Sequence, residues 1–468
     1  MSAAPALARE TPVPVAGARV GVLGLARSGA AVARLLAQSG AEVYASDVSS
    51  AEGIAAAARA LAAEGVDAVA GGHDRARLAA CDWLVVSPGI PPAAPVLEDP
   101  VITELGVYSE IEVASWFARA PIVAVTGTNG KSTTTALLGA LALEAGLRAS
   151  VAGNIGRAFS AAILEDPDAD WYIVEVSSFQ LAGVATFRPR VAVVLNFSAD
   201  HLDRYSAIED YLRDKARIAA QQGAEDHLCL SAEDPALFRL GLDRPVARHW
   251  FHRSRPVERG ATVLDGWITL VEEPGAGRVV QVDRLKIPGW HNVQNALAAT
   301  LAAALMGIDR AGAATGLAAF TGIPHRLETV AVRDGVTWVN DSKATNVASA
   351  EVGLQAFQGP LIVILGGRHK GSPYAPLAPL LTGRAHHVLA IGEAASRIES
   401  ELGAAAPVTV VGTLERAVER ARELARPGDV VLLSPACSSY DQFTGFEERG
   451  ECFRRLAQNR AAGPKVRR

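Results

Sequence analysis

Cysteine and long apolar runs are scarce in this sequence, and each scarcity excludes a class of protein. No Cys-x-x-Cys pair occurs among the widely spaced Cys81, Cys229, Cys437 and Cys452. We therefore expect neither a zinc ribbon nor a disulfide framework and interpret these residues as reduced structural thiols. No stretch approaches the roughly 20 uninterrupted apolar residues that cross a bilayer, and the N-terminus lacks the apolar core of a signal peptide. These absences predict a cytoplasmic protein without membrane insertion.

A strong excess of either charge is absent as well. The net charge of the 468 residues is −5 at pH 7, which implies no general attraction to nucleic acid. The hydrophobic content of 49% and the charged content of 20% suit a globular α/β protein with a large core. A chain of this length predicts roughly two to four domains, and we expect three, at 1–109, 110–322 and 323–468.

Short apolar runs alternate with helical patterns along the chain. The expected strands are 19–23, 42–46, 82–86, 122–125, 171–176, 191–195, 361–365, 387–391, 408–411 and 430–433. The clearest expected helices are 30–38, 292–306 and a long one after Ser132, while 244–282 looks β-rich and irregular. Because strands and helices alternate, we expect parallel sheets in all three regions.

The strongest chemical signal is the glycine-rich segment between the strand ending near Val125 and the helix after Ser132. A loop in this position directs backbone N–H groups at phosphate, while its lysine adds positive charge and its serine hydroxyl can bind Mg²⁺. Only two residues separate the glycines instead of the usual four, so the loop is a shortened variant. The segment predicts an ATP phosphate site made of Gly127, Thr128, Asn129, Gly130, Lys131, Ser132 and Thr133.

A second glycine-rich turn at 24–29 follows the first strand and matches the dinucleotide fingerprint, except that Ala26 replaces the middle glycine. Asp47 lies where an acidic residue meets a ribose. This turn alone is compatible with a dehydrogenase and as well with a domain that holds another nucleotide, and a purely structural turn is the remaining alternative.

Polar residues gather where later strands end. Glu175 and His201 follow two strands of the phosphate-loop region, and a carboxylate with an imidazole there predicts Mg²⁺ binding. A dense cluster at 341–346 follows another strand, Arg326 offers a further cation, and 434–439 forms one more corner that can receive an anion.

Together and in this order, these segments resemble the Mur ligase family over nearly the whole chain. The resemblance rests on 126–132, 175–180, 200–205, 291–296, 324–326 and 340–346. The ending 434–443, with Phe446-Glu447 and Arg449-Gly450, resembles the members that add glutamate, and the Asp-Asn-Pro-Arg of the members that add diaminopimelate or lysine is absent. The family implies an α/β fold with three domains: a Rossmann-like domain for the UDP group, a central P-loop ATPase with a parallel sheet, and a Rossmann-like domain for the amino acid.

The resemblance implies an amide ligase of peptidoglycan synthesis that uses ATP and Mg²⁺. It would phosphorylate the carboxylate of UDP-N-acetylmuramoyl-L-alanine to an acyl phosphate, which the amine of D-glutamate then attacks. Its partners would be these small molecules alone, and we expect a monomer. The alternatives are another amide ligase of this fold, such as a folylpolyglutamate synthetase, a regulator that has lost catalysis, and an NAD-dependent dehydrogenase.

The resemblance also assigns residues, and Lys131, His201 and Lys215 would be catalytic. The magnesium ligands would be Ser132, Glu175, His201 and a carbamylated Lys215, for which an ordinary helix-surface lysine is the alternative. The other nucleotide contacts would be Asn292, Asn295, Arg326 and Asp341. The UDP-sugar would contact Arg27, Ser28, Asp47, Ser87, Gly89 and Asn154, and the amino acid Lys343, Thr345, Lys370, Ser439 and Phe446. The departures are Ala26, where glycine is common, and His369, where relatives often carry aspartate.

Overall fold

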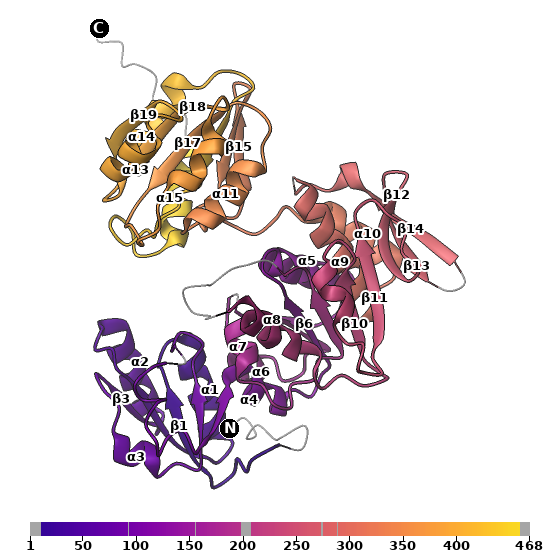
Figure 1. Cartoon of the computed structure of the whole chain (residues 1–468), viewed down its shortest axis with the longest axis vertical. Coiled ribbons are helices and arrows are strands. Elements are labelled where there is room, and N and C mark those ends of the chain that lie inside the picture. The colour runs from indigo at the N-terminus through magenta and orange to yellow at the C-terminus, as the bar shows by residue number, and fades with distance from the viewer. Residues whose placement is uncertain are drawn as a thin grey trace. The chain divides into compact units, whose positions relative to one another are not determined.

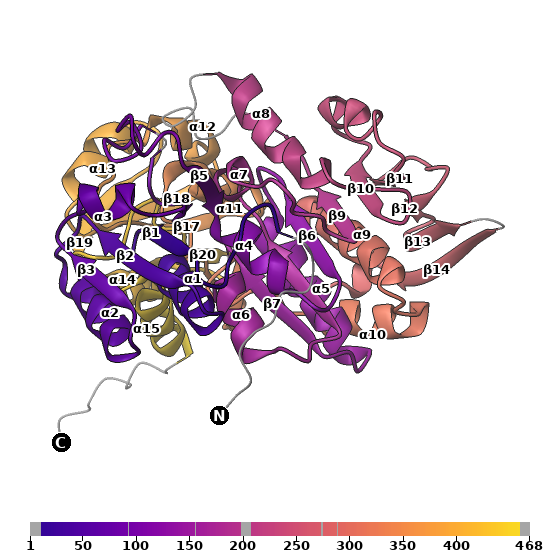
Figure 2. The same cartoon turned by 90° about the horizontal axis from the view of Figure 1, so that it is seen from below.

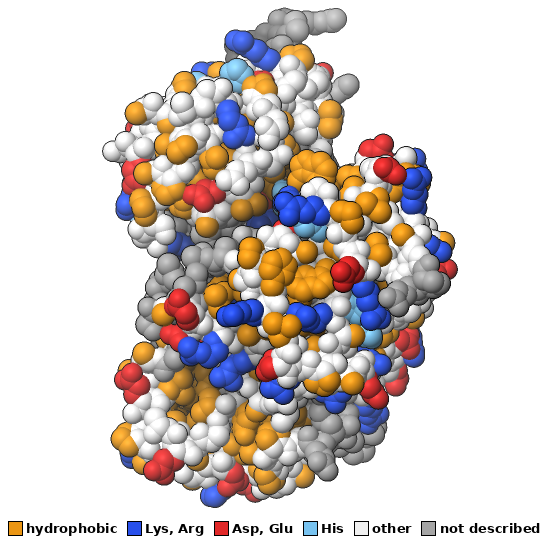
Figure 3. Space-filling model, turned by 45° about the vertical axis from the view of Figure 1, so that its right-hand side comes forward, with side chains coloured by type: hydrophobic (Ala, Val, Ile, Leu, Met, Phe, Trp, Pro, Cys, Tyr) orange, Lys and Arg blue, Asp and Glu red, His pale blue; other side chains and the backbone are white. Residues whose placement is uncertain are grey.

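The structure is a computed structural model that describes residues 11–91, 93–154, 156–197, 207–272, 275–287 and 289–458 (Figure 1). The chain divides into two compact units. The first comprises 1–286 and 290–320, and the second comprises 287–289 and 321–468. Among the described residues, no helix is long and apolar enough to span a membrane. Figure 3 shows acidic and basic side chains intermixed on the face in view.

The first unit begins with a five-stranded parallel sheet in the order β3-β2-β1-β4-β5. Its strands are β1 (Arg19–Leu23), β2 (Glu42–Asp47), β3 (Asp67–Ala70), β4 (Trp83–Val86) and β5 (Gly106–Ser109). The helices that accompany them are α1 (Arg27–Gln38), α2 (Glu52–Ala63), α3 (Arg75–Ala79) and α4 (Glu110–Phe117). The strand order reverses between β1 and β4, and α/β sheets bind their ligands at such a switch point.

The second sheet of this unit has nine strands in the order β14-β13-β12-β11-β10-β9-β6-β8-β7. The strands are β6 (Ile122–Thr126), β7 (Ala149–Gly153), β8 (Trp171–Glu175), β9 (Val191–Val194), β10 (His227–Ser231), β11 (Ala247–His252), β12 (Gly260–Leu264), β13 (Trp267–Glu272) and β14 (Gly275–Gln281). The helices are α5 (Lys131–Glu144), α6 (Phe159–Glu165), α7 (Ser178–Ala182), α8 (Ile208–Ala216), α9 (Trp290–Leu305) and α10 (Arg310–Ala319), with 3₁₀ turns η1 (Arg217–Ala219), η2 (Pro235–Arg239) and η3 (Val282–Arg284). Figure 2 shows β7 between α5 and α6, and both helices contact it.

The expectation of a wholly parallel central sheet is wrong at one edge. From β7 to β12 in the sheet order, which includes β6, each strand is parallel to its neighbours. At the other edge β12 pairs antiparallel with β13, and β13 pairs antiparallel with β14. Asp265 and Gly266 join β12 to β13 with φ angles of 49° and 77°. Two successive positive φ angles make the tight hairpin turn that Asp-Gly favours, so the chain reverses instead of crossing over.

The second unit contains a six-stranded sheet in the order β15-β16-β20-β17-β18-β19. Its strands are β15 (Glu328–Arg333), β16 (Val336–Asn340), β17 (Leu361–Gly366), β18 (Ala385–Ile391), β19 (Val408–Gly412) and β20 (Val430–Leu433). The helices are α11 (Val347–Gln355), α12 (Ala378–Leu381), α13 (Ala395–Leu402), α14 (Leu414–Leu424) and α15 (Phe446–Gln458), with the 3₁₀ turn η4 (Ala375–Leu377). An Asp-Gly turn at Asp334 and Gly335, with φ of 49° and 76°, makes β15 antiparallel to β16 and corrects the parallel expectation here too.

Both faces of this sheet are covered by helices. Leu361, Val363 and Leu365 of β17 pack in one core cluster with residues of α11 and α13, and Ile362 and Ile364 pack in another with residues of α14 and α15. Successive residues of a strand point to opposite faces, so a strand buried on both sides reads as a continuous apolar run. This arrangement confirms the predicted α/β fold of the second unit.

Two carboxylates of α4 are buried in the core of the first unit. Glu112 accepts hydrogen bonds from three successive backbone N–H groups at 185–187 and from the Trp116 indole. Glu110 accepts one from Ser160 N, at 2.5 Å, while its Oε2 has no hydrogen-bond partner within the described part of the chain. Burial therefore raises the pKa of Glu110 to about 7.

We expect Glu110 to make the protein less stable as the pH rises. The folded state holds the Glu110 proton up to about pH 7, whereas the unfolded chain releases it near its ordinary pKa of 4.5. The free energy of unfolding should thus fall between these two values, by about 3 kcal/mol in all. Glu110→Gln should remove this dependence and raise the melting temperature at pH 8 relative to wild type.

The measurement is thermal unfolding of both proteins at pH 5 and pH 8, with Glu104→Gln, the loss of an exposed carboxylate, as the control. A difference between Glu110→Gln and wild type that is the same at both pH values would contradict the prediction.

Candidate active site

The predicted phosphate loop lies between β6 and α5. Gly127 and Gly130 have φ angles of 151° and 86°, and Gly130 caps the N-terminus of α5. A Cβ atom at Gly130 would collide with Asn295, and one at Gly127 would lie 2.9 Å from the Leu195 Cβ. Both positions therefore require glycine, which lets the loop direct its backbone N–H groups at a ligand beside the helix N-terminus.

Two lysines meet at this loop. The Lys131 ammonium group donates to the carbonyls of Gly127 and Thr128, at 2.9 Å each, and the Lys215 ammonium group donates to the same Gly127 carbonyl at 2.8 Å. Lys215 is only 1% exposed and its Nζ lies 4.8 Å from the centre of the Tyr211 ring. This burial excludes the alternative of a helix-surface lysine. The two hydrogen bonds to the Gly127 carbonyl place both ammonium groups beside one oxygen.

Side chains from other elements close the loop on its remaining sides. The Tyr211 hydroxyl of α8 lies 2.9 Å from the Thr128 Oγ1. From α9, the Asn295 Oδ1 accepts from Thr134 at 3.4 Å, and the Asn295 amide donates to the Asn292 Oδ1 at 3.0 Å. The structure thus brings Asn292 and Asn295, predicted to contact the nucleotide, to the phosphate loop; their roles stay predictions.

Glu175 ends β8 next to the phosphate loop, because it pairs with Val125 of β6. Its side chain is 1% exposed; Oε1 accepts from the Asn154 amide at 2.8 Å, and Oε2 has no hydrogen-bond partner among the described residues. A buried carboxylate oxygen that no described group satisfies fits a hard cation such as Mg²⁺. No group of three or more His, Cys, Asp and Glu side chains gathers for a metal within the described ranges, and His201, the other predicted ligand, lies outside them.

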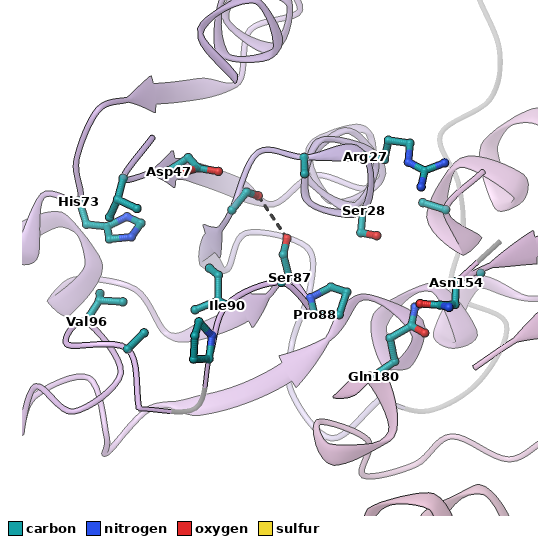
Figure 4. A pocket seen from close by; sticks show the side chains of 18 of the residues that line it. Arg27, Ser28, Asp47, His73, Ser87, Pro88, Ile90, Val96, Asn154 and Gln180 are labelled. Carbon is teal, nitrogen blue, oxygen red and sulfur yellow. Dashed lines mark hydrogen bonds between the residues drawn. The ribbon is translucent and has the colours of Figure 1, made fainter. Parts of the chain in front are cut away.

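A cavity of about 750 Å³ opens in the first unit, at the carboxyl end of β1 and β4 (Figure 4). All six predicted UDP-sugar residues line it: Arg27, Ser28, Asp47, Ser87, Gly89 and Asn154. Figure 4 shows Arg27 and Asn154 toward one end, and Asp47 and His73 toward the other. Asn154 lines the cavity and also donates to Glu175, which pairs with Val125 at the end of β6, just before the phosphate loop.

The turn at 24–29 forms one wall of this cavity. A Cβ atom at Gly29 would overlap the Gly24 carbonyl, and the Ser87 hydroxyl donates to that carbonyl at 3.3 Å. Asp47 accepts from Leu25 N at 2.8 Å and from Ser49 N at 2.9 Å, so its carboxylate holds the turn in addition to lining the cavity. The absence of a middle glycine at Ala26 is compatible with this turn.

The prediction missed two polar residues of the cavity, Gln180 and His73. Gln180 forms a capping box with Ser177 at the start of α7, and the three-residue spacing of serine and glutamine in the sequence indicates this pattern. His73 follows β3 and accepts or donates a hydrogen bond with the Ser46 Oγ at 2.9 Å. Its position after the carboxyl end of a strand was the only available signal.

In the second unit, Asp341 follows β16 and is 1% exposed. It accepts from the Leu327 N–H at 3.2 Å and from the Ser434 hydroxyl at 2.8 Å. Burial raises the pKa of the Asp341 carboxyl to about 6, although Arg326 opposes the shift. His325 and Leu327, on either side of Arg326, have φ angles of 64° and 46°, a strained backbone of the kind found at ligand sites.

Arg449 forms hydrogen bonds with several of the segments that are predicted to hold the amino acid. It is buried, with its pKa lowered to about 10 by desolvation, and it donates to the carbonyls of Ser342, Cys437 and Ser438. The Ser342 hydroxyl donates to the Phe446 carbonyl at 2.8 Å, and the Lys343 Nζ lies 5.9 Å from the centre of the Phe446 ring. Lys343, Thr345, Ser439 and Phe446 are therefore carried by segments that one buried cation joins.

The loops that carry Lys370 and Ser439 are also joined. Arg368 and Ser438 form an isolated antiparallel bridge, with N–H to carbonyl distances of 2.9 and 3.2 Å. Gly367 has a φ angle of 133°, and a Cβ atom there would collide with the Ser438 carbonyl. The bridge brings the loop after β17 against the loop after β20, one residue before Ser439 and two before Lys370.

Comparisons with known proteins agree with this architecture. Three family models match: "Mur ligase MurD-like, N-terminal domain" at 18–108, "Mur ligase middle domain" at 125–303 and "Mur ligase, glutamate ligase domain" at 325–437. Among solved structures, UDP-N-acetylmuramate-alanine ligase from Thermotoga maritima has a TM-score of 0.58 at 18% identity, covering 93% of this chain and 98% of its own. At that identity the match concerns the fold alone.

Curated relatives match over almost their whole length. The UDP-N-acetylmuramoylalanine–D-glutamate ligase of Anaeromyxobacter dehalogenans is 47% identical, over 95% of this chain and 98% of its own. The ligase of the same name from Myxococcus xanthus is 43% identical, over 95% and 99%. The chain therefore belongs to the Mur ligase family.

Proposed function

We propose that this protein is an ATP-dependent ligase that joins D-glutamate to UDP-N-acetylmuramoyl-L-alanine in peptidoglycan synthesis. Relatives that carry this name match the chain at 40–47% identity over at least 96% of their length. The proposal includes the three domains at 1–109, 110–322 and 323–468. It also places a monomer in the cytoplasm, where ATP and nucleotide-linked sugars are available.

The observation that carries the proposal is the contact between Asn154 and Glu175. Asn154 lines the cavity of the first unit, and its amide holds the carboxylate that lies beside the phosphate loop. In the proposal, a substrate in the cavity presents its carboxylate to a phosphate held by the loop. A ligase that forms an acyl phosphate needs its substrate carboxylate close to the ATP phosphate, whereas a dehydrogenase does not need this arrangement.

The chemistry follows from this arrangement. A carboxylate oxygen of the alanine attacks the γ-phosphorus, the bond to the β-phosphate oxygen breaks, and ADP leaves. The amine of D-glutamate then attacks the acyl carbon, and the tetrahedral intermediate expels phosphate to leave the amide, while the amine proton passes to a base. The loop N–H groups and Lys131 orient the phosphate and neutralise the charge that develops on it.

Mg²⁺ fits the residues around the loop, where it would supply charge neutralisation for the phosphates. In the proposal Ser132, Glu175 and His201 hold it, and a carbamate on Lys215 holds a second ion. The ammonium group would first lose a proton, and CO₂ would then add to the neutral amine with release of a second proton, so that a buried cation becomes an anion. The change would end the contact of two cations with the Gly127 carbonyl and so relieve their repulsion.

The test is phosphate release from ATP by the purified enzyme, with each substrate omitted in turn. Release should require both UDP-N-acetylmuramoyl-L-alanine and D-glutamate, and L-glutamate, glutamine and alanine should be poor replacements. Release that depends on a folate substrate, or that needs no amino acid, would contradict the proposal.

We expect Lys370→Ala to raise the KM for D-glutamate strongly and to leave the KM for ATP nearly unchanged. Lys370 is exposed beside the Arg368–Ser438 bridge, where its cation can pair with a carboxylate of the amino acid. Losing a charged hydrogen bond of this kind should raise the KM about ten- to a hundredfold. Steady-state kinetics with Arg416→Ala, an exposed cation of the same unit, as control would check it. An effect on ATP instead would place the glutamate site elsewhere.

A further inference from the structure

The side chain of His369 lies between two partners of the second unit. The Arg397 Nη1 lies 2.7 Å from its Nε2, and its Nδ1 lies 3.0 Å from the Tyr374 hydroxyl. A guanidinium group only donates hydrogen bonds, so Nε2 must accept and Nδ1 must carry the proton. His369 therefore donates to the Tyr374 oxygen.

The chain of hydrogen bonds continues into the core. Because the Tyr374 oxygen accepts from His369, its hydroxyl is free to donate to the Cys437 Sγ, 2.9 Å away. Tyr374 is 1% exposed and Cys437 is fully buried. Arg397, His369 and Tyr374 thus each donate to the next member of the series, which ends at the Cys437 Sγ.

A rigid element holds the outer end of the series. Arg397 lies on α13 and also donates to the Glu401 Oε1 at 2.6 Å, while the Glu401 Oε2 accepts from the Tyr374 N–H at 2.5 Å. Tyr374 is therefore bonded at its backbone and at its hydroxyl by groups that lead back to one helix. The conformation of the loop between β17 and η4 depends on these bonds.

Two members of the series adjoin residues of the predicted glutamate site. His369 directly precedes Lys370, and Cys437 lies two residues before Ser439. We infer that Arg397, His369, Tyr374 and Cys437 form a positioning network that fixes Lys370 relative to Ser439 and thereby sets the affinity for D-glutamate. This inference rests on the proposed function, since it assumes that Lys370 and Ser439 contact the amino acid.

The test is Tyr374→Phe, which keeps the ring and deletes the hydroxyl that joins His369 to Cys437. The KM for D-glutamate should rise about tenfold, because the loop that carries Lys370 loses its anchor, while the KM for ATP and for UDP-N-acetylmuramoyl-L-alanine should change less than about twofold. Tyr172→Phe is the matched control. It deletes a phenol hydroxyl that donates to the Asp166 carbonyl at 2.9 Å in the first unit, and all three KM values should stay unchanged.

His369→Leu should raise the KM for D-glutamate in the same way, and the double variant should be no worse than either single one, because both changes break one network. His369→Leu also serves in place of Tyr374→Phe if that variant does not fold, since it removes both the acceptor for Arg397 and the donor to Tyr374. Unchanged KM values, equal changes for all three substrates, or additive effects in the double variant would overturn the inference while D-glutamate remains the substrate. A wild-type enzyme that does not use D-glutamate would instead overturn the proposed function itself, and the inference with it.

Discussion

Replacing Lys131 with alanine should reduce the turnover number about a thousandfold or more while the protein still folds. The Lys131 ammonium group lies on the phosphate loop and is one of two lysine cations that contact the Gly127 carbonyl. Without it, the loop loses the positive charge that the proposal sets against the transferring phosphate. The free energy of unfolding should fall only slightly, since the lost side chain donates to two loop carbonyls and each such bond contributes about 1 kcal/mol.

The measurement is phosphate release at saturating substrates, together with the melting temperature. Arg239→Ala removes an exposed cation from the same unit and should leave both values unchanged. Activity of Lys131→Ala within a few-fold of wild type would show that the loop does not hold the transferred phosphate.

Lys215→Ala should be nearly inactive as well, for a different reason. Lys215 is buried against the phosphate loop, and the proposal makes it a carbamate that binds metal. Its loss removes an anion, so a small carboxylate that enters the space should restore part of the rate. We expect a loss of about a thousandfold, with partial recovery in millimolar acetate or formate.

The same acids supply the control for this result. They should not restore Lys131→Ala, whose missing group is a cation. A fully active Lys215→Ala enzyme would contradict a metal-binding role, and equal rescue of both variants would show that the acids act elsewhere.

The parts of the site that one strand end carries could be predicted from the sequence. The phosphate loop follows β6, Glu175 ends β8 and Asp341 follows β16, because an apolar run followed by polar residues marks the carboxyl end of a strand. The antiparallel hairpins were missed although their Asp-Gly turns, at 265–266 and 334–335, are visible in the sequence. The alternation of strands and helices elsewhere outweighed that local signal.

Contacts between distant segments could not be predicted. Lys215 reaches the Gly127 carbonyl across 88 positions of sequence, and Tyr374 reaches Cys437 across 63. Periodicity describes one element at a time, whereas these contacts depend on how α8 packs on the loop after β6 and how two loops meet in the second unit. For a lysine on a short helix, a surface position therefore stays open as an alternative.

In the proposed reaction, ATP activates the alanine carboxylate as an acyl phosphate before D-glutamate attacks. The most direct measurement uses UDP-N-acetylmuramoyl-L-alanine labelled with oxygen-18 in both carboxylate oxygens, followed by mass spectrometry of the phosphate released. One carboxylate oxygen bridges to phosphorus and leaves with it, so we expect one labelled oxygen in each phosphate and ADP as the other product. Unlabelled phosphate, or label found in AMP, would contradict it.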